Sequence, residues 1–179
     1  MKKTVLVFGL IAGFIVSIFM VLTMANCIDS SNFEHSMWLG YTAMIIAFSF
    51  VFVGIKNFRD KNNGGAITFG KAFQTGLWIT LIASTMYVTV WLVDYYFFIP
   101  DFMDKYSAHM IEQVKASGAS AAELDKTVTQ MASFKEMYKN PVMVILFTYL
   151  EILPVGLVIT LISSLILKRK TNNPAGIAA

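Results

Sequence analysis

Long apolar runs alternate with short polar segments along this chain. The runs cover residues 4–28, 36–55, 72–93 and 141–167, and among them they contain one charged residue, Glu151. Each run reaches the ~20 residues that a helix needs to cross a hydrocarbon core ~30 Å thick. The pattern therefore predicts an all-α membrane protein with four transmembrane helices, at about 4–27, 36–56, 69–99 and 141–167.

Segment 101–140, between the third and fourth runs, has a different pattern. Apolar residues recur there at helical spacing, at Tyr106, Met110, Val114, Leu124, Val128, Met131 and Tyr138. Gly118 interrupts this pattern, and Ser120 followed by Glu123 matches the capping box that starts a new helix. We expect an amphipathic hairpin of two helices outside the membrane. The pattern leaves open whether it lies on the bilayer or packs on the spans.

The third span is longer than the membrane requires. As one helix, 69–99 would extend ~46 Å, so it must tilt or protrude from the ~30 Å core. Its far end carries an aromatic cluster suited to a membrane interface, formed by Trp91, Tyr95, Tyr96, Phe97 and Phe98. Pro100 then ends or bends the helix.

The composition indicates a membrane protein, and the distribution of charge predicts its orientation in the membrane. With 56% hydrophobic and 14% charged residues, the chain is too apolar for an ordinary soluble domain. We expect one membrane domain, 1–170, followed by a disordered cytoplasmic tail, 171–179. One side of the four spans would carry Asp60 and nine cations, namely Lys2, Lys3, Lys56, Arg59, Lys61, Lys71, Lys168, Arg169 and Lys170. The positive-inside rule places that side, with both termini, in the cytoplasm, near membrane lipid headgroups. The hairpin is then extracytoplasmic.

Small residues recur four apart within the spans. These stripes of small residues include Gly9, Gly13, Gly76 and Gly156. They let helix backbones approach closely, which matters because helices in lipid have no hydrophobic reason to associate with one another. Two interpretations remain open. The stripes either pack the spans of one chain together or form a homo-oligomer face, most plausibly at Gly9 and Gly13.

Two carboxylates are predicted within the spans. Glu151 lies ~15 Å below the start of the fourth helix, near the bilayer middle, where a charge costs at least ~2.5–3.5 kcal/mol. Pro154 should bend the same helix and free a carbonyl near Leu150. Asp94 lies ~9 Å from the outer end of the third span. In one interpretation Glu151 is a proton or cation site with Asp94 at its entrance, aided by Tyr87, Thr89 or Tyr149. In the other, Glu151 is neutral and hydrogen-bonded to a neighbouring helix, and Asp94 reaches headgroups.

The sequence offers no enzyme signature. The two histidines, His35 and His109, have no second ligand at metal-binding spacing, and Cys27 is the only cysteine. No glycine-rich phosphate loop follows a strand. We therefore expect no catalytic activity, no metal, no cofactor and no nucleic-acid partner.

Three segments together resemble a known family. They are Phe52-Val53-Gly54-Ile55-Lys56 running into Gly64-Gly65-Ala66-Ile67-Thr68-Phe69-Gly70-Lys71-Ala72-Phe73, then Tyr95-Tyr96-Phe97-Phe98-Ile99-Pro100-Asp101-Phe102, and Glu151-Ile152-Leu153-Pro154-Val155-Gly156-Leu157 leading into Lys168-Arg169-Lys170. As a set, they resemble the bacterial membrane family called domain of unknown function 4199. The resemblance covers nearly the whole chain, implies a four-span bacterial inner-membrane protein and assigns no activity.

Two functions remain open at this point. The first is a non-enzymatic accessory protein that binds a protein partner through 101–140. The second is a small proton- or cation-coupled transporter, acting as an oligomer and centred on Glu151.

Overall fold

The structure is a computed structural model that describes residues 1–30 and 33–169, with side chains described for 1–25 and 38–169. In these ranges the α-helices are α1 (Lys2–Ser30), α2 (Phe33–Asn57), α3 (Phe69–Val93), α4 (Phe102–Ala116), α5 (Ala121–Tyr138) and α6 (Pro141–Leu167). Two π-helical segments, η1 (Phe58–Asn62) and η2 (Asp94–Phe98), extend α2 and α3. The predicted tail, 171–179, and the side chain of Cys27 lie outside the described residues.

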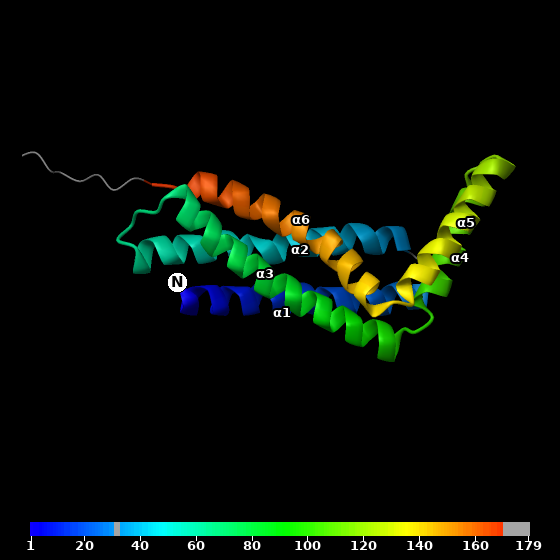
Figure 1. Cartoon of the computed structure of the whole chain (residues 1–179), viewed down its shortest axis with the longest axis horizontal. Helices are drawn as coiled ribbons and strands as arrows, with labels where there is room; N and C mark the ends of the chain where they lie inside the picture. Colours follow the sequence, from blue (N-terminus) through cyan, green and yellow to red (C-terminus); the bar gives the residue numbers. More distant parts are fainter. Residues whose placement is uncertain (31–32, 170–179) are drawn as a thin grey trace, which may run out of the picture.

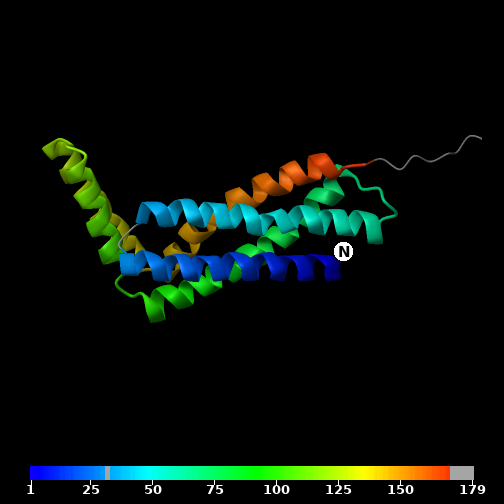
Figure 2. The same cartoon turned by 180° about the vertical axis from the view of Figure 1, so that it is seen from behind.

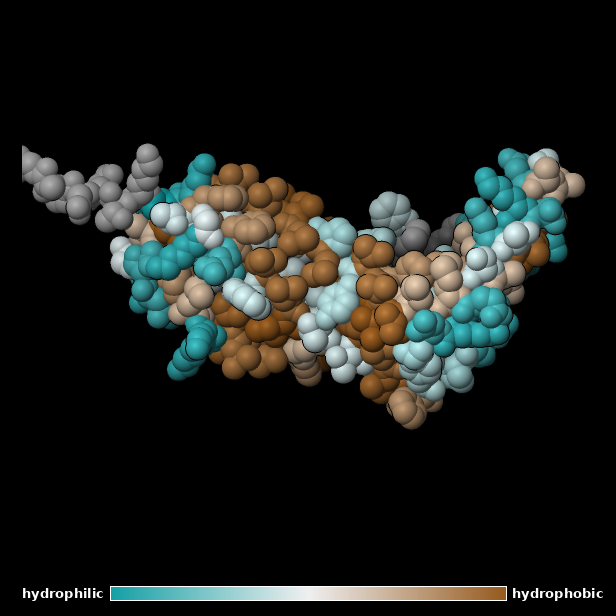
Figure 3. Space-filling view, in the orientation of Figure 1, coloured by the Kyte–Doolittle hydropathy of each residue, from teal (hydrophilic) through white to brown (hydrophobic). Residues whose placement is uncertain are grey.

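The four long helices form a bundle that matches the predicted fold class. α1 and α6 each lie beside both α2 and α3 (Figures 1 and 2). The helices long and apolar enough to span a membrane are Lys2–Ala25, Trp38–Asn62, Phe69–Phe98 and Pro141–Leu167. Figure 3 shows an apolar belt between two polar ends. Large side chains such as Phe14 and Leu150, 62% and 67% exposed, lie outside the packed core, as expected for a surface that faces lipid.

The helical hairpin lies between the third and fourth spans, as predicted. α4 and α5 project from the end of the bundle opposite the N-terminus (Figures 1 and 2). The capping box is confirmed: the Ser120 hydroxyl accepts a hydrogen bond from the Glu123 N–H at 3.3 Å, and the Glu123 carboxylate accepts one from the Ser120 N–H at 2.9 Å. Gly118 makes the turn between the two helices with φ +73°, a conformation that costs glycine little. An ion pair between Lys135 and Asp104 joins the two helices.

The helix ends differ from the prediction in two places. The connection between the first two spans, which the predicted spans place at 28–35, is shorter, because α1 continues to Ser30 and α2 begins at Phe33. The third span is not one α-helix over 69–99. It widens into η2, whose last turn closes when the Ile99 N–H donates to the Asp94 carbonyl at 2.9 Å. Pro100 has no N–H to continue the helix, so the chain turns into the hairpin there.

Glycines bring the spans into close contact. A Cβ on Gly9 would lie 2.8 Å from Ile82 Cβ, and one on Gly13 would lie 2.7 Å from Met86 Sδ, so both glycines face α3 of the same chain. Gly76 and Gly156 occupy the contact between α3 and α6, where added Cβ atoms would meet the methyl groups of Thr160 and Thr80. The Gly9–Gly13 face is thus occupied within the chain. A second copy would have to use another surface.

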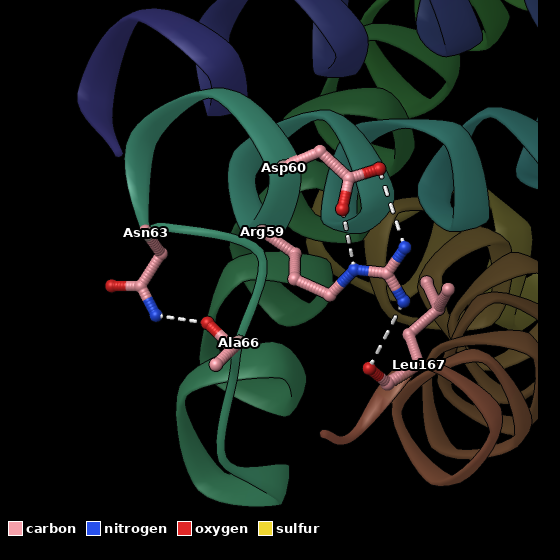
Figure 4. Close-up of polar contacts among 5 residues, drawn as sticks. All are labelled: Arg59, Asp60, Asn63, Ala66 and Leu167. Carbon is pink, nitrogen blue, oxygen red and sulfur yellow. Dashed lines mark hydrogen bonds and ion pairs between the residues drawn. The ribbon is translucent and has the colours of Figure 1, made fainter. Parts of the chain in front are cut away.

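Polar contacts hold the connection between α2 and α3 against the end of α6 (Figure 4). Arg59 donates to Asp60 at 2.6 and 3.2 Å and to the Leu167 carbonyl at 3.4 Å, while the Asn63 amide donates to the Ala66 carbonyl. Ile67 and Arg169 exchange two backbone hydrogen bonds, of 3.0 and 2.9 Å. This end carries the cations flanking the spans.

Candidate ligand cavity

A partly open cavity of about 390 Å³ lies at the hairpin end of the bundle, and each of the helices α1 to α6 contributes to its wall. Its lining residues are Val16, Met20, Thr23, Met24, Gly40, Tyr41, Ala43, Met44, Tyr87, Trp91, Phe102, Met103, Tyr106, Phe134, Tyr138, Phe147 and Glu151. The volume lies within the range of ~300–1,000 Å³ that is usual for small-molecule sites. The wall is mainly aromatic and apolar, with a few polar groups.

Aromatic side chains of the hairpin close this cavity against the spans. Trp91 of α3 meets the edge of Phe102 of α4 at a centroid distance of 5.1 Å. On the other side, Tyr138 of α5 stacks on Phe147 of α6 at 5.8 Å, and Phe134 lies 5.0 Å from Phe147. Such aromatic pairs each contribute about 0.5–1.5 kcal/mol beyond burial. They fix the base of the hairpin to the bundle and make the hairpin part of the cavity wall.

Helical spacing places the polar groups on the cavity-facing sides of the spans. Phe147 and Glu151 lie one turn apart on α6, and Tyr87 and Trp91 lie one turn apart on α3. Residues four apart share a helix face, so each pair presents an aromatic group and a polar group to the same space. Gly40 and Ala43 of α2 add little bulk to the wall.

Glu151 is the one charged residue among the described residues that line the cavity. Its side chain is exposed to a water-sized probe even though it lies in the span 141–167. Within the described part of the chain its carboxylate makes no hydrogen bond and no ion pair; the recorded hydrogen bonds and salt bridges of the spans involve other groups. The predicted hydrogen bond from a neighbouring Ser, Thr or Tyr is therefore not found there. Because an unpaired charge at this depth is costly, the carboxyl group is either neutral or accompanied by a cation.

Tyr138, which lies in α5 outside the spans, is affected by the charge of Glu151. Burial, followed by the negative charge of Glu151 and smaller effects of Tyr95 and Tyr106, raises the pKa of the Tyr138 phenol to about 12. Both effects disfavour the phenolate: burial removes it from water, and a nearby carboxylate repels it. Tyr138 therefore presents a neutral hydroxyl to the cavity across the physiological pH range.

The other residues predicted to share a site with Glu151 have different positions. Asp94 begins η2, is half-buried and does not line the cavity. Pro154 lies inside α6, which continues as one α-helix past it. Tyr149 hydrogen-bonds Thr85 at 2.9 Å instead of facing Glu151. Thr89 lines a shallow apolar depression outside the cavity. Of the predicted helpers of Glu151, Tyr87 alone lines the cavity.

Sequence reasoning missed most of the cavity wall. Tyr41, Tyr106 and Tyr138 come from three different helices and meet through contacts distant in sequence. The apolar periodicity of the hairpin did single out Tyr106 and Tyr138 as one face, but it could not show what that face covers. Among the described residues, no group of three or more His, Cys, Asp or Glu side chains is arranged to hold a metal ion.

Comparison with protein families assigns the chain to a known group. The family model described as Protein of unknown function (DUF4199) matches residues 7–169. The chain belongs to this family. No curated protein and no solved structure matched the chain.

The DUF4199 match includes the cavity. Every lining residue, from Val16 to Glu151, falls within residues 7–169, as do the basic connection after α2 and the hairpin. Because the description of the DUF4199 family states no activity, a function for this member has to be argued from the cavity.

Proposed function

We propose that this protein is a non-enzymatic bacterial inner-membrane protein that binds a small positively charged solute in the cavity. The observation that carries the proposal is Glu151, a carboxylate within a span that lines a 390 Å³ cavity and has no cationic or hydrogen-bonding partner in the described residues. An ionisable group within a span is costly to insert, so it is interpreted by default as a functional site such as a solute or proton path. The excess of cations at the opposite end supports an orientation in which the cavity faces the outer side.

The same arrangement of residues also supports a protein that uses cation binding for transport. A cation that binds at Glu151 competes with a proton for the carboxylate, so binding would be linked to pH. On the opposite side of Glu151 from the hairpin, α3 and α6 are joined by the Thr80–Thr160 hydrogen bond of 2.9 Å and by the close approach at Gly156. A carrier would have to open this contact between α3 and α6, alone or within an oligomer.

Cation-dependent stabilisation tests the proposal directly. The purified protein and Glu151→Gln would be melted in detergent with chlorides of sodium, potassium, magnesium and tetramethylammonium. A ligand at 100 times its Kd stabilises the folded state by about 2.7 kcal/mol. We expect at least one of these cations to raise the unfolding temperature of the native protein and leave that of Glu151→Gln unchanged. If all four act equally on the two proteins, Glu151 is not a cation site.

A second function is supported by the position of the hairpin. α4 and α5 project beyond the bundle (Figure 1), and α5 has no buried residue. Val128 is 42% exposed on α5 and offers an apolar contact for a protein partner. A photo-crosslinking residue at Val128, used in living cells, would join one defined protein if the hairpin is a docking element. Adducts with lipid alone would count against this second function.

A further inference from the structure

The cavity selects one class of cation. Building on the cation-binding function proposed above, we infer that its ligand is an amphipathic organic cation, an ammonium group on an aromatic or hydrocarbon body, rather than an inorganic ion. The ammonium would lie at Glu151 and the body against the aromatic wall.

The sign of the ligand follows from the charges that face the cavity. Glu151 is the one charged residue among the described lining residues, which include no Lys, Arg or His. The other polar lining residues are Trp91, with its indole N–H, and the hydroxyl-bearing Thr23, Tyr41, Tyr87, Tyr106 and Tyr138. They come from α1, α2, α3, α4 and α5, so within residues 1–25 and 38–169 no helix around Glu151 supplies a positive charge to the cavity. An anion would meet a carboxylate with no counter-charge, whereas a cation would neutralise it.

The lining chemistry disfavours a divalent inorganic ion. Calcium takes six to eight oxygen ligands and magnesium about six in near-octahedral geometry, supplied largely by carboxylates, carbonyls and water. Among the residues that the structure describes, one carboxylate lines this cavity and no second acidic side chain joins it. Asp94, the nearest candidate from the sequence, is not part of the wall. An organic ammonium needs one counter-charge and few hydrogen bonds, which is what the cavity provides.

The aromatic wall suits the apolar body of such a ligand. Trp91 and Phe102 form one edge-to-face pair at 5.1 Å, and Tyr138 and Phe147 form one stacked pair at 5.8 Å. Aromatic faces attract ammonium groups and cover apolar bodies, and rings grouped around a site are a known means of binding quaternary ammonium ions. The methionines Met20, Met24, Met44 and Met103 complete the apolar part of the wall. Flexible methionine side chains adapt to ligands of different shape, so we expect broad rather than strict selectivity.

A pair of matched probes tests the class of ligand on the unmodified protein. Benzyltrimethylammonium and neopentylbenzene have the same shape, but only the first carries a charge. Binding would be followed through quenching of the intrinsic tryptophan fluorescence and through the unfolding temperature. We expect benzyltrimethylammonium to bind at least ten times more tightly than neopentylbenzene and more tightly than potassium or magnesium. Equal binding of the two isosteres would overturn the further inference, because the positive charge would then contribute nothing to binding.

Two variants then locate the bound cation. Glu151→Gln should weaken binding of benzyltrimethylammonium at least tenfold and leave binding of neopentylbenzene unchanged. Phe147→Leu should weaken the cation about two- to thirtyfold, the range expected for one lost cation–π contact, and Leu146→Ala, on the exposed surface of α6, should have no effect. If potassium or magnesium binds in a Glu151-dependent way and benzyltrimethylammonium does not, the proposed function stands and the organic ligand class is wrong. If none of these probes binds, both are wrong.

Discussion

The contact between α3 and α6 gives a quantitative prediction at Gly156. A Cβ placed on Gly156 would overlap the Thr80 methyl group and would lie 2.9 Å from Phe48 Cζ. Phe48 and Thr80 are both 0% exposed, so neither side chain has free space into which to move. Thr80 is also held through its hydroxyl, which lies 2.9 Å from that of Thr160. Gly156→Ala must therefore shift a helix or break this hydrogen bond.

Gly156→Ala changes the free energy of unfolding through two opposing contributions. Overpacking a close-packed interior costs about 1–3 kcal/mol, and replacing a helical Gly by Ala returns about 0.5–1 kcal/mol through helix propensity. Gly70→Ala is the matched control, because it makes a similar exchange in α3 with nothing within 4 Å of the new Cβ. The difference between the two variants then isolates the packing term of about 1–3 kcal/mol.

Thermal unfolding in detergent, followed by tryptophan fluorescence, measures this difference. On the scale known for soluble domains of this size, we expect Gly156→Ala to melt about 2–12 °C below Gly70→Ala. Size-exclusion chromatography before each melt would show whether both variants are equally monodisperse. If Gly156→Ala melts at or above Gly70→Ala, the close approach of α3 and α6 at this glycine is wrong.

Two further predictions concern the hairpin. The pKa of Tyr138, raised from 10 to about 12, implies stability that is complete below pH 10 and lost as pH rises toward 12, because the unfolded chain releases this proton first. An absorbance titration of tyrosinate should lose a step near pH 12 in Tyr138→Phe, and that step should move to lower pH in Glu151→Gln. Ser120→Ala should reduce the protection of first-turn α5 amides against hydrogen exchange about fivefold, since losing the cap costs about 1 kcal/mol. Lowering the pH should reduce the same protection, expressed relative to the intrinsic exchange rate at each pH, because hydrogen bonds from Ser120 hold the pKa of Glu123 below its ordinary value. Unchanged protection would exclude the capping role.

The spans and the hairpin could be predicted because local patterns encode them. A run of ~20 apolar residues has few alternatives to a membrane helix, and Ser120 with Glu123 marks a helix start within four residues. The same reasoning predicted Glu151 as the costly residue of the fourth span. The structure places Glu151 on a cavity wall. The sequence did not decide between a cavity and a packed contact at this residue.

The residues that line the cavity with Glu151 could not be predicted, because they depend on how the hairpin folds back. Asp94 was expected at the cavity entrance from its depth along α3. In the structure, α3 changes to η2 at Asp94, and Phe102 of the hairpin packs on Trp91 at that level. The wall there consists of hairpin residues, and Tyr138 approaches Glu151 from α5. These contacts join segments that are distant in sequence. The local periodicity of apolar residues therefore cannot predict them.

Thiol labelling at Glu151 tests the central claim that this residue lines a cavity that a small solute can enter at the hairpin end of the bundle. In a Cys27→Ser background, Glu151→Cys would be treated in sealed vesicles with a membrane-impermeant cationic methanethiosulfonate. Leu150→Cys is the control, because Leu150 is the adjacent residue, is 67% exposed on the apolar surface and does not line the cavity. We predict rapid labelling of Glu151→Cys from the side that carries the hairpin and no labelling of Leu150→Cys. Equal resistance of both thiols would contradict the claim.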